Sequence, residues 1–332
     1  MDAGKLSPEK LNEIILSRLG ARRPETRLRA RLGEDSAALD FGGDLIVAST
    51  DPITGAAREA GWLAVNVACN DLATNGAEPV ALLLSLMAPV GTAEATLATL
   101  MEGAHQAAVD LNVEIVGGHT EIVPVVTQPI FVATALGRVR PDRLITSAGA
   151  KPGYQLVLTK GAGLEGTAIL ALDYADRLRS LSPEEVRRAQ ALAWEISVVR
   201  DGLIAAKNGA TAMHDVTEGG VLGALYELAE ASGVGVTVWE EAIPLRPETR
   251  LICGELEIDP LRLISSGAML ICCPDGRRVI EALRAEDIPA ALIGEVTTGG
   301  RFIVRKDGTR RPIEPPAADE LWRAKAKLDV AE

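Results

Sequence analysis

The order of apolar and polar residues along the chain predicts alternating helices and strands. In the first half, apolar residues recur at helical spacing over residues 92–111. Two more helices are predicted there, one starting at Ser7-Pro8 with the serine as its N-cap, and one over residues 62–76 that ends at a glycine. Short apolar runs that are typical of strands occupy residues 45–50, 80–87, 113–116 and 130–139. The first half is therefore expected to mix helices and strands.

A turn at Pro152-Gly153 marks the expected boundary between two domains, residues 1–150 and 151–332. Beyond this turn, helices are predicted at residues 163–174, 183–207, 220–232 and 319–327, and from residue 277 onward. Strands are predicted at residues 154–159, 234–239, 268–273, 290–296 and 301–304, the last of which opens a hairpin through Gly308. Both halves combine the two kinds of element, so the expected fold class is α/β (α+β) with two domains.

Composition narrows the function classes. Of the 332 residues, 47% are hydrophobic and only 3% aromatic, which predicts cores built from small aliphatic side chains. A net charge of −12 disfavours nucleic acid as a partner, and it means that ATP would need a divalent cation to bind. The sequence contains no recognisable signal peptide and no run of about 18 apolar residues that could span a membrane. The four cysteines lack metal-site spacing and imply no disulfide framework, which fits a reducing compartment. We therefore expect a cytoplasmic protein, and the missing apolar run means that no membrane partner is expected.

Two short segments of the first half place an aspartate beside small residues. Asp35 lies in the segment GEDSAA, and Asp51 lies in the segment STDP at the end of a predicted strand. Carboxylate oxygens in such places could hold a hard cation such as Mg²⁺. Taken alone, an acidic turn explains the first segment equally well, and an Asx turn before proline explains the second one better than a cation site does.

The predicted helix over residues 62–76 carries an unusual polar stripe. Asn66, Asn70 and Thr74 recur every four residues, and Asp71 lies beside them in an otherwise small and apolar segment. Asparagine and aspartate are poor helix formers, and they are costly to bury without partners. A solvated helix face normally carries Lys, Glu or Arg. The stripe therefore indicates a binding site more than a solvated face.

Three further segments combine glycine with polar groups next to a predicted strand or helix. The strand at 113–116 runs into the segment GGHT, where paired glycines would admit a phosphate and the histidine could move a proton. A Lys-Gly pair follows the segment LVLT without the spacing of a Walker A loop. The segment HDVTEGG enters a helix whose N-terminus would attract an anion. An ordinary turn or N-cap explains each of them singly, but together with the carboxylates they suit a magnesium nucleotide.

In this order, the segments GEDSAA, STDP, NVACNDLATNGAEP, GGHT, the Lys-Gly turn and HDVTEGG resemble the PurM-like (AIR synthase-related) family. The resemblance implies a two-domain PurM-like fold in which an N-terminal sheet forms a dimer barrel beside a C-terminal mixed α/β domain. It implies an ATP-dependent enzyme that activates an oxygen of an acceptor, with Mg²⁺ held by Asp35, Asp51 and Asp71. It places Asn70, Gly117, Gly118, Thr120, Lys160, Thr217, Gly219 and Gly220 at the cofactor or acceptor, and it makes His119 and Asp215 the catalytic candidates.

Within the family, the layout is most similar to HypE-like hydrogenase maturation factors, which implies a homodimer, a small-molecule or protein-borne acceptor and a maturation-protein partner. HypE proteins carry a cysteine at the C-terminus, whereas the last cysteine of this sequence is Cys273. GGHT resembles selenophosphate synthetase, and Glu34 departs from the thiamine-monophosphate kinase pattern. Three alternatives stay open: a phosphotransferase like either of those two enzymes, a nucleotide-binding assembly factor without turnover, and a chain in which every motif is structural.

Overall fold

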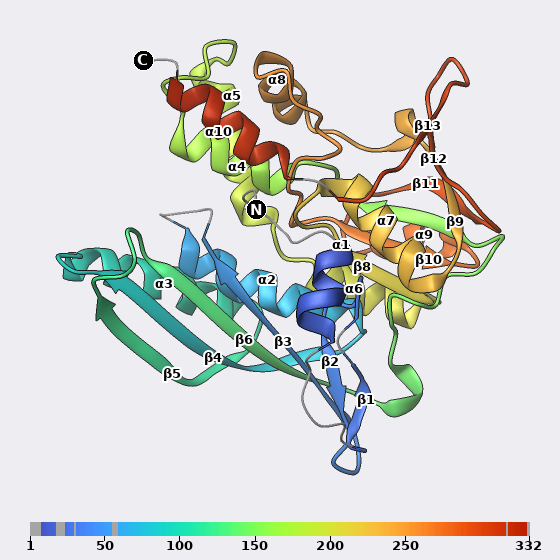
Figure 1. Cartoon of the computed structure of the whole chain (residues 1–332), viewed down its shortest axis with the longest axis horizontal. Helices are drawn as coiled ribbons and strands as arrows, with labels where there is room; N and C mark the ends of the chain where they lie inside the picture. Colours follow the sequence, from blue (N-terminus) through green and yellow to red (C-terminus); the bar gives the residue numbers. More distant parts are fainter. Residues whose placement is uncertain (1–7, 18–23, 30, 55–58, 317, 331–332) are drawn as a thin grey trace. The chain divides into compact units, whose positions relative to one another are not determined.

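The chain forms two compact units, each built on its own β-sheet (Figure 1). The N-terminal unit comprises Arg22–Ala30 and Asp35–Leu144, and the C-terminal unit comprises Met1–Ala21, Arg31–Glu34 and Ile145–Glu332. The computed structural model describes residues 8–17, 24–29, 31–54, 59–316 and 318–330. The expected N-cap Ser7 lies outside these residues. The segment that follows it forms a short helix, α1 (Pro8–Lys10), which continues as a π-helix, η1 (Leu11–Leu16).

Six strands form the sheet of the N-terminal unit, in the order β1-β2-β3-β6-β4-β5. Their bounds are β1 (Thr26–Leu28), β2 (Ala37–Leu39), β3 (Leu45–Ile53), β4 (Glu78–Pro89), β5 (Glu114–Val123) and β6 (Ile130–Val139). Among the described residues of this sheet, β4 and β5 are the one pair of strands that runs in parallel. The predicted helices are confirmed as α2 (Ala60–Thr74) and α3 (Glu94–Asp110), which cover one face of the sheet (Figure 1). The other face exposes aliphatic side chains, among them Ile46, Val80 and Leu83.

Two strands of this unit extend through predicted turns. β3 continues through Asp51, which pairs with Ala133 of β6. β5 continues through residues 117–120, so the predicted Gly-Gly turn at that position is wrong. A Cβ atom on Gly118 would lie 1.8 Å from the carbonyl oxygen of Leu84. Close approach of β4 therefore accounts for a glycine that the sequence suggested was there to admit a phosphate.

Seven strands form the sheet of the C-terminal unit, in the order β13-β12-β9-β11-β7-β10-β8. Their bounds are β7 (Gln155–Thr159), β8 (Ala212–Asp215), β9 (Gly235–Trp239), β10 (Met269–Cys273), β11 (Ala290–Thr297), β12 (Arg301–Val304) and β13 (Arg310–Pro312). The helices are α4 (Leu164–Asp173), α5 (Pro183–Ala191), α6 (Val199–Lys207), α7 (Gly220–Ser232), α8 (Pro247–Glu255), α9 (Gly276–Arg284) and α10 (Glu320–Val330). The short 3₁₀ helices are η2 (Pro141–Arg143) in the N-terminal unit, and η3 (Leu192–Glu195) and η4 (Glu240–Ala242) in this one.

The main core of the C-terminal unit lies between its sheet and α7. Leu156 and Leu158 of β7 belong to one buried cluster with Leu225 and Leu228 of α7. Side chains alternate along a strand, so the residue between the two leucines faces the other side of the sheet, toward α9. The predicted hairpin at the end of the unit is confirmed, because β12 pairs antiparallel with β13.

The C-terminal unit differs from the sequence prediction in four places. The helix expected over 183–207 is divided into α5, η3 and α6, and the carbonyl oxygens of Glu195 and Ser197, at the break before α6, accept hydrogen bonds from the Lys160 ammonium group. Strand β8 and helix α8 were not predicted. Residues 31–34 belong to this unit although they lie between strands β1 and β2 of the N-terminal sheet in the sequence: a Cβ atom on Gly33 would lie 2.7 Å from the carbonyl oxygen of Glu227 on α7. Among the described residues, no helix combines the length and apolar character needed to cross a bilayer.

Candidate functional site

A network around Ser49 joins two of the expected metal ligands in the N-terminal unit. The Ser49 hydroxyl on β3 hydrogen-bonds the Asp71 carboxylate on α2, and it lies 3.1 Å from the carbonyl oxygen of Asp35. Asp51 lies two residues along β3 from Ser49, so both side chains project from the same face of the sheet, toward α2. The arrangement supplies carboxylate oxygens, which are the ligands that Mg²⁺ prefers. Asp35, Asp51 and Asp71 do not form one of the groups of mutually close ligand atoms found among the described residues, so their role as joint magnesium ligands stays a prediction.

The polar stripe of α2 is buried. Asn66, Asn70, Asp71 and Thr74 are all at most 6% exposed, so the stripe is not a solvated helix face. Asn66 and Thr74 bond within the helix: the Asn66 amide donates to the carbonyl of Trp62 at 2.9 Å, and the Thr74 hydroxyl donates to the carbonyl of Asp71 at 2.6 Å. These bonds offset the cost of burying polar groups. The predicted role of Asn70 at a phosphate stays a prediction.

His119 is separated from the aspartates within one chain. It lies on β5, the edge strand, whereas Asp51 lies on β3, and β4 and β6 come between them. At about 4.8 Å per strand, that separation is roughly 14 Å across the sheet. The His119 side chain is 73% exposed and lies 3.8 Å from the carboxylate of Glu121. Within a single chain, the predicted residues of β5 and the three aspartates therefore do not meet.

In the C-terminal unit, Asp215 ends strand β8 in a buried environment. Asp215 is 2% exposed, and its Oδ2 makes no hydrogen bond among the described residues. The neighbouring His214 has Nδ1 at 2.7 Å from the Asp215 carbonyl oxygen and Nε2 at 3.0 Å from the Glu227 carboxylate on α7. A carbonyl oxygen only accepts hydrogen bonds, so Nδ1 of His214 carries a proton. The hydrogen bond between Nε2 and the Glu227 carboxylate contains a second proton, which belongs to one of these two groups. This pair fixes the backbone from which Asp215 projects.

The glycine turn before α7 is bound to protein rather than left open to an anion. The N–H of Gly219 donates to Oδ2 of Asp319 at 2.7 Å, and the N–H of Gly220 donates to the carbonyl of Thr217 at 3.0 Å. Oδ1 of the same Asp319 accepts the N–H groups of Ile264, at 3.1 Å, and Leu321, at 2.8 Å. The expectation that the two glycine N–H groups bind an anion is therefore wrong. Sequence reasoning missed Asp319, which lies far along the chain.

Lys160 also departs from its predicted role. Its ammonium group lies 3.4 Å from the buried carboxylate of Asp201, and it donates to the carbonyl oxygens of Ser197 at 2.5 Å and Glu195 at 3.3 Å. The side chain is only 11% exposed. A buried carboxylate needs such a counter-charge. The contacts of Lys160 therefore give its charge a structural role within the fold, and its predicted role at a nucleotide stays a prediction.

Glu165 is a buried acid that the sequence analysis did not single out, and it is influenced by charges at the glycine turn before α7. Glu165, in the first turn of α4, is 5% exposed, and its Oε2 makes no hydrogen bond among the described residues. Burial above all raises the pKa of Glu165 to about 7; the charges of Asp319 and Glu218 add to the rise, and hydrogen bonds from Ser266 oppose it. Burial also raises the pKa of Asp319 to about 6. The sequence signal that could have identified Glu165 is an acidic residue within an apolar helix, which is the same signal that identified Asp71 of α2.

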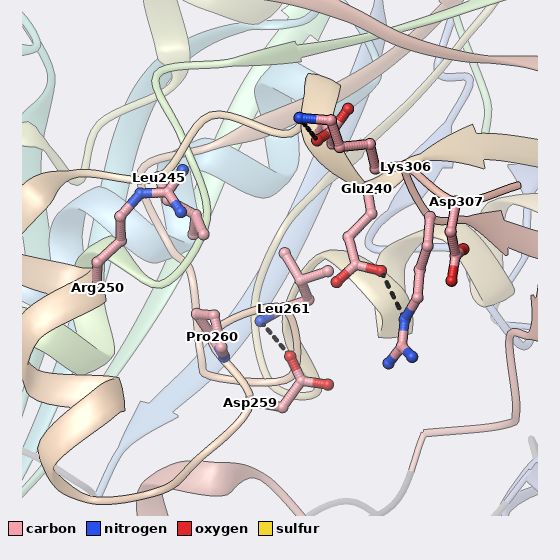
Figure 2. Close-up of a pocket in the computed structure, with 10 residues that line it drawn as sticks. Glu240, Leu245, Arg250, Asp259, Pro260, Leu261, Lys306 and Asp307 are labelled. Atoms are coloured by element: carbon pink, nitrogen blue, oxygen red, sulfur yellow. Dashed lines mark hydrogen bonds and ion pairs between the residues drawn. The ribbon is translucent and has the colours of Figure 1, made fainter. Parts of the chain in front are cut away.

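A cavity of about 610 Å³ opens elsewhere on the C-terminal unit (Figure 2). Its lining residues are Glu240, Glu241, Leu245, Arg250, Asp259, Pro260, Leu261, Arg305, Lys306 and Asp307. The Arg305 guanidinium pairs with Glu240 at 3.3 Å, and the Lys306 ammonium group pairs with Glu241 at 3.6 Å. None of these residues belongs to a predicted motif. Two of the three basic side chains that line the cavity are therefore paired with acidic ones.

The chain combines two α/β units that contain buried carboxylates. Comparison of its sequence with known families identifies the class of two-domain proteins to which it belongs. Residues 33–139 match the family of AIR synthase related protein, N-terminal domain, and residues 151–307 match its C-terminal domain. The carbamoyl dehydratase HypE of Cupriavidus necator is 31% identical over 308 residues, covering 88% of this chain and 86% of that protein. The chain belongs to the AIR synthase-related, PurM-like family, among its HypE-like members.

Two further comparisons agree with this assignment. A hydrogenase expression/formation protein of Azotobacter chroococcum is 30% identical over 295 residues, covering 83% of this chain and 82% of that protein. The crystal structure of a HypE–HypF complex contains a chain that superposes with a TM-score of 0.76 at 22% identity, covering 92% of this chain and 99% of that one. The structural likeness concerns the fold, which is therefore the two-domain PurM-like fold that the sequence predicted.

Proposed function

We propose that this chain is an enzyme that uses Mg-ATP to activate an oxygen atom of a small or protein-borne acceptor. The observation that carries the proposal is the Ser49 network, which joins Asp71 of α2 to the backbone of Asp35 on the helix-covered face of the N-terminal sheet. Asp35, Asp51 and Asp71 would hold Mg²⁺, which would neutralise charge on the ATP phosphates. Asn70, buried beside Asp71, would then lie close to the nucleotide.

The names of the relatives suggest the acceptor chemistry. Removing water from a carbamoyl group, as the name carbamoyl dehydratase describes, turns a primary carboxamide into a nitrile. Transfer of the terminal phosphoryl group of ATP to the carboxamide oxygen would make that oxygen a leaving group. The C–O bond then breaks, the nitrogen loses its two protons, and the products are nitrile, ADP, phosphate and one proton. We propose this reaction type for the present chain, with Asp215 in the acceptor-binding part of the C-terminal unit.

A homodimer would complete the site. Strand β5 is an edge strand whose residues 116–122 are all exposed, and unpaired edges invite pairing with another chain. The open face of the same sheet exposes Ile46, Val80 and Leu83, which a second copy would cover. His119 and Thr120 could then approach the aspartates of the partner copy, although they are remote from those of their own chain. A maturation-protein partner is a further proposal, in analogy to the HypE–HypF complex.

The cytoplasm is the proposed location. The four cysteines are unpaired and buried, and burial raises the pKa of the Cys69 thiol to about 12, which keeps it protonated and unreactive. Free thiols of this kind suit a reducing compartment.

The decisive experiment is isothermal titration of the full chain with ATP, with and without Mg²⁺. Wild type should bind ATP only with Mg²⁺, and Asp71→Asn should weaken binding at least tenfold, because an amide of the same shape replaces a charged ligand. Asp44→Asn is the matched control, since Asp44 is an exposed acid of the same unit. Absence of Mg-dependent binding in wild type would refute the proposal. Binding without ADP formation, when carboxamides are supplied, would instead favour a nucleotide-binding assembly factor.

A further inference from the structure

The cavity of about 610 Å³ on the C-terminal unit has one basic side chain that no acid neutralises. Arg250 of α8 lines it together with Arg305 and Lys306, which lie on the turn between β12 and β13. The latter two are paired with the glutamates of η4. Among the described residues, the Arg250 side chain makes no ion pair and no hydrogen bond. One positive charge of the lining is therefore available to a ligand.

Two aspartates contribute negative charge to the same cavity. Asp307 accepts the N–H of Thr309 at 2.8 Å, and it makes no ion pair with any residue that the structure describes. Hydrogen bonds from Thr309 lower the pKa of Asp307, so this carboxyl group is charged at neutral pH. Asp259 accepts the N–H of Leu261 at 3.0 Å, and its other oxygen lies 4.0 Å from the Arg311 guanidinium. A backbone N–H group orients a carboxylate without cancelling its charge.

Apolar side chains lie between the unpaired charges. Figure 2 shows Arg250 on one side of the cavity and Asp307 on the other, with Pro260 and Leu261 between them. Leu261 is 4% exposed and belongs to the main core of the unit, so this part of the wall is fixed by packing. The volume of the cavity falls within the range of roughly 300–1,000 Å³ that is typical of small-molecule sites. The cavity therefore combines a guanidinium group, an apolar wall and carboxylates.

We propose that this cavity binds a small aliphatic zwitterion, a molecule with a carboxylate at one end, an ammonium group at the other and a short methylene chain between them. Arg250 binds the carboxylate, to which a guanidinium group can donate two parallel hydrogen bonds. Asp259 and Asp307 bind the ammonium group, and the methylene chain contacts Pro260 and Leu261. The inference goes beyond the proposed function, because no residue of the lining belongs to the positions proposed for Mg-ATP or the acceptor.

The charges of the lining disfavour other classes of ligand. The lining contains four acidic and three basic side chains, and one of these bases is unpaired among the described residues. A phosphate ester with two negative charges would therefore meet more acids than free bases. An entirely apolar molecule would take Arg250 and the aspartates out of water without giving them partners, which is costly. A zwitterion supplies an opposite charge to each of them.

The test is isothermal titration of the full chain, at low ionic strength, with three compounds of the same chain length. ε-Aminocaproate carries both charged groups, caproate carries only the carboxylate, and hexylamine carries only the ammonium group. Wild type should bind ε-aminocaproate roughly tenfold more tightly than either of the others, because a second pair of opposite charges adds to the same apolar contact. Equal affinities for the three compounds, or no binding of ε-aminocaproate, would overturn the proposal.

Two variants test which end of the ligand each charge binds. Arg250→Gln should weaken the binding of ε-aminocaproate about tenfold and leave that of hexylamine unchanged. Asp307→Asn, which keeps an acceptor for the Thr309 N–H, should weaken the binding of hexylamine and ε-aminocaproate and leave that of caproate unchanged. Arg278→Gln is the matched control, because Arg278 is an exposed arginine of α9 that does not line the cavity. A loss of ε-aminocaproate binding that this control shares, or a loss of hexylamine binding in Arg250→Gln, would contradict the role of Arg250.

Discussion

The buried carboxyl of Glu165 should cost the protein stability at neutral pH, and replacing it with glutamine should remove that cost. The pKa of Glu165 rises from 4.5 to about 7 on folding, chiefly through burial. Between these two values the folded protein binds more protons than the unfolded chain, so the free energy of unfolding falls as the pH rises. A rise of this size corresponds to roughly 3 kcal/mol. Glutamine does not titrate, so Glu165→Gln lacks this loss.

Urea unfolding at a series of pH values from 4 to 8.5 measures the difference. Three of the four tryptophans, Trp194, Trp239 and Trp322, belong to the C-terminal unit, so their fluorescence reports mainly on the unit that contains Glu165. The variant should gain about 3 kcal/mol on wild type between pH 4 and pH 8. Asp319 titrates in both proteins, so its contribution largely cancels. Stability curves that run parallel over the whole range would refute the reasoning that Glu165 is buried and uncompensated.

Three other substitutions test the local structure. Asp319→Ala leaves three backbone N–H groups without their acceptor, two of them in buried hydrogen bonds, and should destabilise the C-terminal unit by about 3–5 kcal/mol in urea unfolding. Gly118→Ala should separate β5 from β4 and make the amide hydrogens of β5 exchange faster. Gly117→Ala should leave this exchange unchanged, because its Cβ would lie 3.4 Å from Cδ2 of Leu83, an ordinary contact. Lys160→Met strands the Asp201 carboxylate and should cost about 3–5 kcal/mol, with unchanged ATP affinity; a selective loss of ATP binding would restore Lys160 to the nucleotide.

Local patterns in the sequence were sufficient for most of the elements. The 3.6-residue spacing of apolar side chains predicted α2 and α3, and apolar runs predicted the central strands, because burial of one face imposes these periods. Strands β1 and β2, with three residues each, are too short to produce a pattern. The strand predicted over residues 113–116 was shorter than β5, because Gly-Gly is usually a turn. Only the close approach of β4 shows why glycine is needed within this strand.

For the candidate site too, the sequence identified some features and only the tertiary structure showed the others. The sequence alone singled out Asp35, Asp51 and Asp71, because carboxylates among small apolar residues are conspicuous, and the order of the motifs identified the family. Which groups meet is a matter of long-range contacts. The Ser49 bridge joins residues from three segments, and Asp319 binds a turn 100 residues before it in the chain.

The sequence therefore determined the inventory of elements and charges, while the tertiary structure decided which charges are available to a ligand. Lys160 and the Gly219 N–H group have the right chemistry for a phosphate, but the folded chain supplies each of them with a carboxylate partner. Glu165 is the reverse case: it belongs to none of the motifs, and folding buries it with one carboxyl oxygen that makes no hydrogen bond among the described residues. Hydrogen bonding and desolvation depend on neighbours that folding brings together, which local sequence patterns do not record.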